Sequence, residues 1–157
     1  IRAFMNEKPE ALLPVTRSII ESADRFSATD TFEALYTLQE LRRTTEKIWD
    51  EIDALIVPTA PIAPKVAELE ADPISPNGRL GTYTNFVNLL DLCALAVPGP
   101  FRSDGVPAGT TIIAPRGHDR ILTDLGARIF SGIGAQDISK FGGWRAYVSA
   151  SVADVTS

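Results

Sequence analysis

The hydrophobic pattern of this chain changes its period at Asp53, and this change restricts the fold more than any other feature. Before Asp53, apolar residues recur every three or four positions, which predicts one long amphipathic helix that starts after Ser27. After it, residues 54–57 form a short apolar run that ends at Pro58, as is typical of a buried strand in a helix-covered sheet. The long helix should bury one stripe, formed by Phe32, Leu35, Leu38, Leu41, Ile48 and Ile52.

The residues before this helix predict two shorter helices within residues 2–25, because Pro9 and Pro14 interrupt the apolar pattern there. Ser27 then offers a hydroxyl for the N-cap of the long helix, and Asp30 offers a carboxylate three residues later. This pair is close to a capping box, and it also places negative charge at the positive end of the helix dipole.

The second half of the chain alternates loops, strands and helices. Nine of its eleven prolines lie between Pro58 and Pro115, so residues 58–77 read as a surface loop with one helical turn at 67–71. Helical spacing returns in residues 84–92 and 119–130, and residues 94–97 and 110–113 are two further short strands. This order predicts an α/β fold, although three strands make a poor sheet alone.

Composition excludes several classes of function. Fifteen basic against twenty acidic residues give a net charge of −5, which argues against a nucleic-acid partner. The longest uncharged stretches are about half of the roughly 18 apolar residues that a membrane span needs. Cys93 is the only cysteine and no N-terminal hydrophobic leader precedes the first helix, so we expect a cytoplasmic protein. The chain begins at Ile1 without an initiator methionine, and we expect it to be a piece of a longer protein.

Few residues offer catalytic chemistry. His118 is the only histidine, and we expect it in a solvent-facing loop ahead of a helix; general acid–base work needs a nucleophile beside it. Cys93 has apolar neighbours, which favours a buried structural thiol over a nucleophile. Without a cysteine pair, a histidine pair or a phosphate-binding glycine loop, we expect neither a metal nor a cofactor.

One polar segment, residues 81–88, is unusual for a purely structural element. It places three hydroxyls and two carboxamides, those of Thr82, Tyr83, Thr84, Asn85 and Asn88, around the start of a predicted helix. Such groups can hold a small polar or anionic ligand together with free backbone N–H groups. The alternative is simple N-capping by a threonine hydroxyl, and the residues alone leave both open.

The same segment carries a family resemblance. Four segments resemble the C-terminal part of amidase signature enzymes: residues 53–61 (DALIVPTAP), 80–92 (LGTYTNFVNLLDL), 94–98 (ALAVP) and 104–111 (DGVPAGTT). Within this family the chain is most similar to the allophanate hydrolase subgroup, and residues 83–92 are the most specific part. The resemblance covers roughly residues 1–130. It implies an α/β fold that is the C-terminal portion of the amidase signature fold, a mixed β-sheet covered by helices, incomplete on its own.

The resemblance also implies that the catalytic residues lie outside this chain. Family members use a serine nucleophile, a second serine on a cis peptide and a lysine, all within a glycine- and serine-rich segment that this sequence lacks. We therefore assign no catalytic residue to this chain. Its lysines, Lys8, Lys47, Lys65 and Lys140, are not flanked by the residues that surround the catalytic lysine in the family. By analogy with the family, Tyr83, Thr84 and Asn88 line the substrate pocket. The implied partners are a small-molecule amide substrate and the N-terminal part of the amidase domain, with a homodimer as a further expectation.

These inferences predict one domain portion at residues 1–131 and a tail or linker at 132–157, where glycines and serines are frequent. The implied function of the intact enzyme is hydrolysis of allophanate to ammonia and carbon dioxide in urea degradation, without metal or cofactor. Two alternatives remain: another amidase signature enzyme, such as a general amidase or a transamidation subunit, and a truncated, non-catalytic scaffold.

Overall fold

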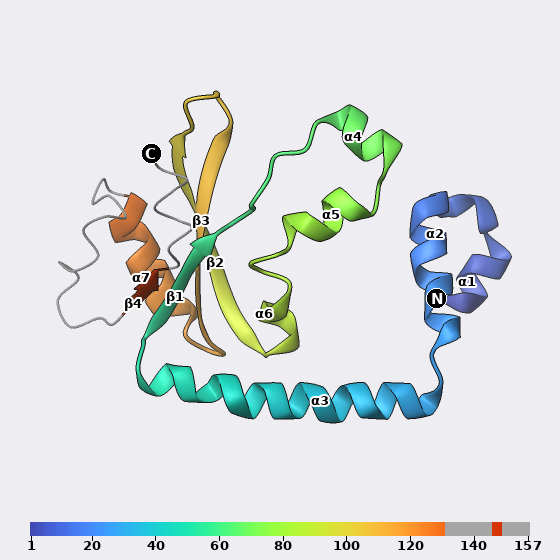
Figure 1. The fold of residues 1–157 in the computed structure, drawn as a ribbon, viewed down its shortest axis with the longest axis horizontal. Helices are drawn as coiled ribbons and strands as arrows, with labels where there is room; N and C mark the ends of the chain where they lie inside the picture. Colours follow the sequence, from blue (N-terminus) through green and yellow to red (C-terminus); the bar gives the residue numbers. More distant parts are fainter. Residues whose placement is uncertain (131–145, 149–157) are drawn as a thin grey trace.

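The computed structural model describes residues 1–130 and 146–148, and it consists of a helical arm joined to a small helix-covered sheet (Figure 1). Its helices are α1 (Arg2–Glu7), α2 (Pro14–Glu21), α3 (Ala28–Glu46), α4 (Val66–Ala71), α5 (Ser75–Leu80), α6 (Phe86–Leu89) and α7 (Asp119–Phe130). Its strands are β1 (Ala54–Pro58), β2 (Leu92–Phe101), β3 (Pro107–Pro115) and β4 (Ala146–Val148). None of the described helices combines the length and apolar character that crossing a membrane requires.

The N-terminal helices confirm the predicted breaks at the prolines. Helix α1 ends before Pro9, and Pro14 occupies the first turn of α2, where its missing N–H costs no helical hydrogen bond. Arg17 of α2 ties the two helices together, because its Nη2 donates to the carbonyl oxygens of Pro9 at 2.9 Å and Met5 at 3.3 Å.

Helix α3 begins with the predicted capping box. The Ser27 amide donates to Asp30 Oδ2 at 2.7 Å, and the Asp30 amide donates to Ser27 Oγ at 3.2 Å. The Ser27 hydroxyl and amide both stabilise the ionised carboxylate, which lowers the pKa of Asp30 from its ordinary value. A 3-10 turn at Lys47–Asp50 then leads from α3 toward β1.

The predicted apolar stripe of α3 is not buried among the described residues, and this expectation was wrong. Phe32 is 58% exposed, Leu35 49% and Leu41 52%. Of the predicted stripe, only Leu38 and Ile52 are half-buried, and the half-buried surface continues from Leu38 through Arg42, Thr45 and Trp49. Periodicity identified an apolar stripe correctly, but most of its side chains are exposed in the described part of the chain.

The four strands form one mixed sheet in the order β2-β3-β1-β4. Strand β3 pairs antiparallel with both β2 and β1, whereas β4 pairs parallel with β1. Strands are thus present at the three predicted places, and β2 and β3 are longer than predicted. Strand β4 belongs to the region predicted as a tail; residues 131–145 and 149–157 lie outside the described part, so the proposed boundary at 131 stays a prediction.

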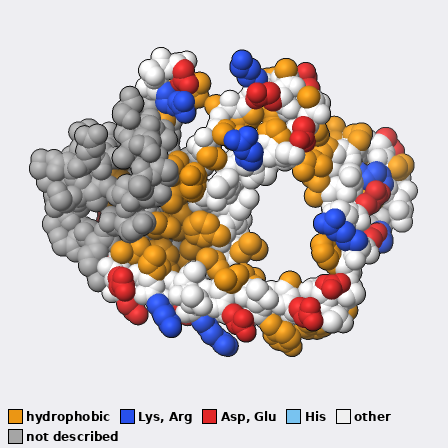
Figure 2. Space-filling view, in the orientation of Figure 1, with side chains coloured by type: hydrophobic (Ala, Val, Ile, Leu, Met, Phe, Trp, Pro, Cys, Tyr) orange, Lys and Arg blue, Asp and Glu red, His pale blue; other side chains and the backbone are white. Residues whose placement is uncertain are grey.

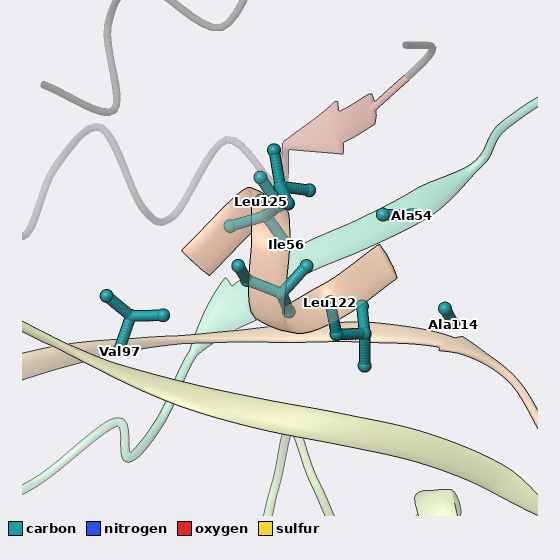
Figure 3. Close-up of a cluster of buried hydrophobic side chains, with 7 residues drawn as sticks. Ala54, Ile56, Val97, Ala114, Leu122 and Leu125 are labelled. Carbon is teal, nitrogen blue, oxygen red and sulfur yellow. The ribbon is translucent and has the colours of Figure 1, made fainter. Parts of the chain in front are cut away.

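Helix α7 covers one face of the sheet. Its Leu122 and Leu125 lie against a cluster that includes Ile56, Val97 and Ile112 (Figure 3). The helix approaches the sheet closely at Gly126, where an added Cβ would lie 2.5 Å from Leu95 Cδ2. This contact and the burial of Leu122 at 1% exposure confirm the amphipathic helix that the spacing predicts.

The opposite face carries a smaller cluster, formed by Val57, Val87 and Ile113, with Val87 supplied by α6. The sequence predicts a helix over residues 84–92, but α6 is only Phe86–Leu89. The reason lies in the chain that follows, since Asp91 has a left-handed φ of 57° and β2 already begins at Leu92. Pairing with β3 therefore replaces the last predicted turn of helix.

Candidate functional site

The α6-side face of the sheet carries two threonine hydroxyls beyond its apolar cluster. Side chains alternate along a strand, so Thr111 shares a face with Ile113, and Thr59 continues the face of Val57. Thr59 and Thr111 Oγ1 atoms lie 2.9 Å apart, and the Thr59 amide donates to the Gly109 carbonyl at 2.9 Å. Thr111 is only 4% exposed, and this pairing satisfies its hydroxyl.

Residues 81–88 fold onto this face through consecutive tight turns. The amides of Thr84 and Asn85 both donate to the Gly81 carbonyl, at 3.0 and 2.8 Å, and the Val87 amide donates to the Thr84 carbonyl at 3.1 Å. The amide group of the Asn85 side chain folds back over Gly81 and occupies the space that a Cβ there would need. Val87, which is 8% exposed, anchors the segment in the cluster.

The three predicted pocket residues are placed differently. Tyr83 is half-buried and packs against the Val57, Val87 and Ile113 cluster. Thr84 is half-buried as well, and Asn88 is exposed on α6. Within residues 1–130, the hydrogen bonds found leave the side chains of Tyr83, Thr84 and Asn88 without a partner, so their polar groups are available to a ligand.

The capping alternative for this segment is not what the structure shows. The N-cap of α6 is Asn85, and its side chain makes no capping hydrogen bond. Thr82 faces the preceding helix, because its Oγ1 donates to the Arg79 carbonyl at 2.7 Å at the end of α5. Neither Thr82 nor Thr84 therefore serves as the N-cap of α6.

Two arginines hold the turn between α6 and β2. Arg42 of α3 donates from Nε to the Leu89 carbonyl at 2.9 Å, although 47 residues separate the two. Arg116 Nη1 lies 3.1 Å from Asp91 Oδ2, next to the left-handed backbone at Asp91. The C-terminal end of the 81–88 segment is thus fixed by residues from α3 and from the chain after β3.

The other candidate residues lie away from this face. His118 is exposed just ahead of α7, as predicted, with Nδ1 3.0 Å from the Pro115 carbonyl oxygen. Cys93 is half-buried on the α7 side, and its Sγ donates to the same carbonyl at 3.1 Å. No group of three or more metal-binding side chains comes together in the part of the chain that the structure describes.

A cavity of about 400 Å³ lies between the N-terminal helices, far along the chain from residues 81–88. Met5, Arg17, Ile20 and Asp24 are among its lining residues. Its guanidinium groups already have partners, because Arg2 pairs with Asp24 and Arg17 with two backbone carbonyls. The two cations of the cavity are therefore already paired.

Sequence reasoning missed three residues of the site, namely Thr59, Thr111 and Arg42. Strand alternation could have placed the two threonines on the face of Val57 and Ile113. No local signal indicates Arg42, because its partner is a backbone carbonyl in a distant segment.

Comparison with known proteins decides the family. The family model described as Amidase matches residues 2–122. The chain belongs to the amidase family. Urea amidolyase of Saccharomyces cerevisiae is 42% identical over 135 residues, which are 85% of this chain and 7% of that protein. A glutamyl-tRNA(Gln) amidotransferase subunit of Corynebacterium jeikeium is 34% identical over 88 residues, which are 55% of this chain and 17% of that protein.

A solved amidase-family structure extends the agreement to three dimensions. Selenomethionine-substituted allophanate hydrolase of Kluyveromyces lactis superposes with a TM-score of 0.78 and 43% identity, over 83% of this chain and 22% of that one. The chain therefore spans less than a quarter of each relative described here. Its mixed sheet and covering helices are part of the amidase fold, and the similarity to allophanate hydrolase inferred from the sequence is confirmed.

Proposed function

We propose that this chain is the C-terminal part of the amidase domain of an allophanate hydrolase. The observation that carries the proposal is the match to the Kluyveromyces lactis allophanate hydrolase, at 43% identity over 83% of this chain. The intact enzyme hydrolyses allophanate to ammonia and carbon dioxide and so takes part in urea degradation and nitrogen metabolism. The match to urea amidolyase supports the same assignment.

In this proposal the catalytic residues lie outside the chain. A serine, assisted by a second serine on a cis peptide and by a lysine, attacks the amide carbonyl, and backbone N–H groups stabilise the charge on the tetrahedral intermediate. Ammonia leaves as the intermediate collapses, and water then releases the acyl group from the serine as a carboxylated carbamate. This product loses carbon dioxide to give carbamate, which breaks down to a second ammonia and carbon dioxide. The present chain contributes sheet strands, covering helices and one wall of the pocket.

Tyr83, Thr84 and Asn88 form that wall. A phenol and a hydroxyl donate and accept hydrogen bonds, and a carboxamide does both through separate atoms, which suits a small substrate with amide and carboxylate groups. The anchoring of Val87 in the sheet cluster supports this role, because it holds the backbone while the polar groups stay unpaired within residues 1–130. A pre-formed wall reduces the ordering cost of binding.

The N-terminal part of the amidase domain is the proposed partner of the exposed apolar surface. Large apolar side chains are exposed on both the helical arm and the sheet, among them Phe4, Leu35, Leu89 and Phe101. Figure 2 shows an opening bounded by α3, the N-terminal helices and the α4–α5 segment, with apolar side chains around it. Many exposed large apolar side chains around one opening are typical of an interface. A homodimer of the intact enzyme and a cytoplasmic location belong to the same proposal.

Another amidase is the second candidate function. The match to the glutamyl-tRNA(Gln) amidotransferase subunit favours a transamidation role, and a general amidase is the related case. Residues 82–88 include no cation, whereas an anionic substrate requires one, so the positive group must come from another part of the enzyme. A truncated scaffold without catalytic activity is the third reading.

The test is made on the full-length natural polypeptide that contains this chain. Its intact mass under denaturing conditions is measured first, and ammonia release is then assayed with allophanate, acetamide and glutamine. We expect a mass well above 16.9 kDa and a preference for allophanate. Activity on acetamide or glutamine without activity on allophanate favours the second candidate, and a single inactive 16.9 kDa species favours the scaffold.

The isolated 157 residues serve as the control. They should release no ammonia from any of the three substrates, because the proposed nucleophile lies elsewhere. Release by this chain alone contradicts both the proposed division of labour and the scaffold.

A further inference from the structure

Arg42 connects two parts of the molecule that the sequence places far apart. It lies on the half-buried face of α3, one helical turn from Leu38, and donates from Nε to the Leu89 carbonyl at 2.9 Å. Arg43, its neighbour, is exposed, and no hydrogen bond or ion pair joins its side chain to another residue in the described ranges. The two arginines therefore have the same chemistry and different surroundings.

The carbonyl that Arg42 binds is one that a helix cannot satisfy itself. Leu89 is the last residue of α6, and the amides that follow turn back instead: Leu90 donates to Phe86 and Asp91 donates to Asn88. The last carbonyls of a helix have no donor within it. A guanidinium supplies a charge-assisted hydrogen bond at this position.

Helix α6 is consequently held at three points. Val87 is buried in the cluster on the sheet, Arg42 binds the carbonyl at the C-terminal end, and the ion pair of Asp91 with Arg116 fixes the turn beyond. Trp49, seven positions after Arg42, packs against the same cluster as Val87. Helix α3 thus supports α6 through the side chain of Arg42, and the 3-10 turn after α3 supports it through Trp49 and the cluster on the sheet.

We propose that Arg42 is a positioning residue for the substrate wall, acting through α6 without touching substrate. The inference rests on the proposed function, because Asn88 precedes the Leu89 carbonyl and belongs to that wall. Loss of the Arg42 hydrogen bond frees the C-terminal end of α6 and displaces the Asn88 carboxamide. Binding is affected and bond cleavage is not, since the nucleophile lies in another segment.

The experiment compares Arg42→Ala with the matched control Arg43→Ala in the full-length enzyme, with allophanate as substrate. Arg42→Ala should raise KM severalfold, with the full value of one charged hydrogen bond, about tenfold, as the upper limit, and kcat should stay within a factor of about two. Arg42→Lys, which keeps a cationic donor, should recover part of the loss. Arg43→Ala should leave both constants unchanged. If Arg42→Ala does not fold, Arg42→Lys and Arg42→Gln are compared in its place.

A double-mutant cycle separates this inference from the proposed function. If Arg42 acts through Asn88, then Arg42→Ala and Asn88→Ala together raise KM by less than the product of their separate effects. If Asn88→Ala raises KM but Arg42→Ala changes only the melting temperature, the positioning role of Arg42 is overturned. The proposal that Asn88 lines the pocket then still stands. Unchanged KM in Asn88→Ala, Tyr83→Phe and Thr84→Val overturns the wall, and the positioning role with it.

Discussion

The hydroxyls of Thr59 and Thr111 lie 2.9 Å apart, although 52 residues separate them in the sequence. Thr59 follows β1 directly, and its amide continues the pairing with β3 beyond Pro58 by donating to the Gly109 carbonyl, while its hydroxyl contacts that of Thr111 within β3. The hydroxyl pair connects the two strands on the face of the sheet that also carries the 81–88 segment.

Removing one hydroxyl of this pair should destabilise the fold. Thr111→Val keeps the shape of the side chain and leaves the half-buried Thr59 hydroxyl without its partner, for an expected loss of about 1 kcal/mol in the free energy of unfolding. Thr59→Val with Thr111→Val should cost less than the sum of the single changes, because neither hydroxyl is then left unpaired. Urea unfolding of the three variants measures this. The control is Thr110→Val on the opposite face, and an equal loss there would show that the hydroxyl pair has no special role.

Gly126 of α7 should not tolerate a side chain. A Cβ there would lie 2.5 Å from Leu95 Cδ2 and 3.2 Å from Val97 Cγ2, so Gly126→Ala forces helix and sheet apart. Overpacking of this kind costs about 1–3 kcal/mol and exceeds the roughly 1 kcal/mol that alanine gains over glycine within a helix. The matched control is Gly78→Ala in α5, where nothing lies within 4 Å of the added Cβ. Thermal unfolding should show a lower Tm for the first variant only; a higher Tm for Gly126→Ala contradicts the close contact.

Because of the capping box of α3, the stability of the folded protein should depend on pH. The hydroxyl and amide of Ser27 lower the pKa of Asp30, so the folded carboxyl releases its proton more readily than the unfolded one. The stabilisation is therefore complete above the ordinary carboxyl pKa of about 4 and is lost as the pH falls through the lower, folded value. Ser27→Ala should raise the pKa of Asp30 toward its ordinary value, as followed by carboxyl NMR titration.

Asp72 provides an internal control for that titration. Its pKa is also lowered, in this case by the hydroxyl and amide of Ser75 and by the amide of Ile74. Ser27→Ala should leave the pKa of Asp72 unchanged. A parallel shift of both carboxyls would indicate a general change in the protein rather than loss of the cap.

The exposed apolar stripe of α3 should be covered in the full-length enzyme. Leu35 is 49% exposed in this chain, and burial against the remainder of the amidase domain would make Leu35→Ser cost about 2–3 kcal/mol. Glu40→Ser, at an exposed charged position of the same helix, should change stability by less than about 0.5 kcal/mol. Chemical unfolding of the full-length variants makes the comparison. If both substitutions have the same small effect, the stripe faces solvent in the intact protein too.

Much of this fold could be predicted from the sequence, because it depends on interactions between residues that are close in the chain. The cap at Ser27, the breaks at Pro9 and Pro14, and the helix at Asp119–Phe130 depend on residues that are close in the chain, and all are present. The strand at Ala54–Pro58 follows from a run of apolar, β-branched residues. Adjacent polar groups make residues 81–88 stand out in the sequence, and the family resemblance then selects Tyr83, Thr84 and Asn88 as site candidates, which stay a prediction.

Only the tertiary structure decided which surfaces meet. The α3 pattern predicts an apolar stripe, yet the face that packs carries Arg42 and Trp49, because the neighbouring element determines which side of a helix is covered. The shortening of α6 follows from the pairing of β2 with β3, and the Thr59–Thr111 and Arg42–Leu89 hydrogen bonds join segments 52 and 47 residues apart. Propensity and spacing act over a few residues, whereas such contacts depend on how the whole chain closes its loops.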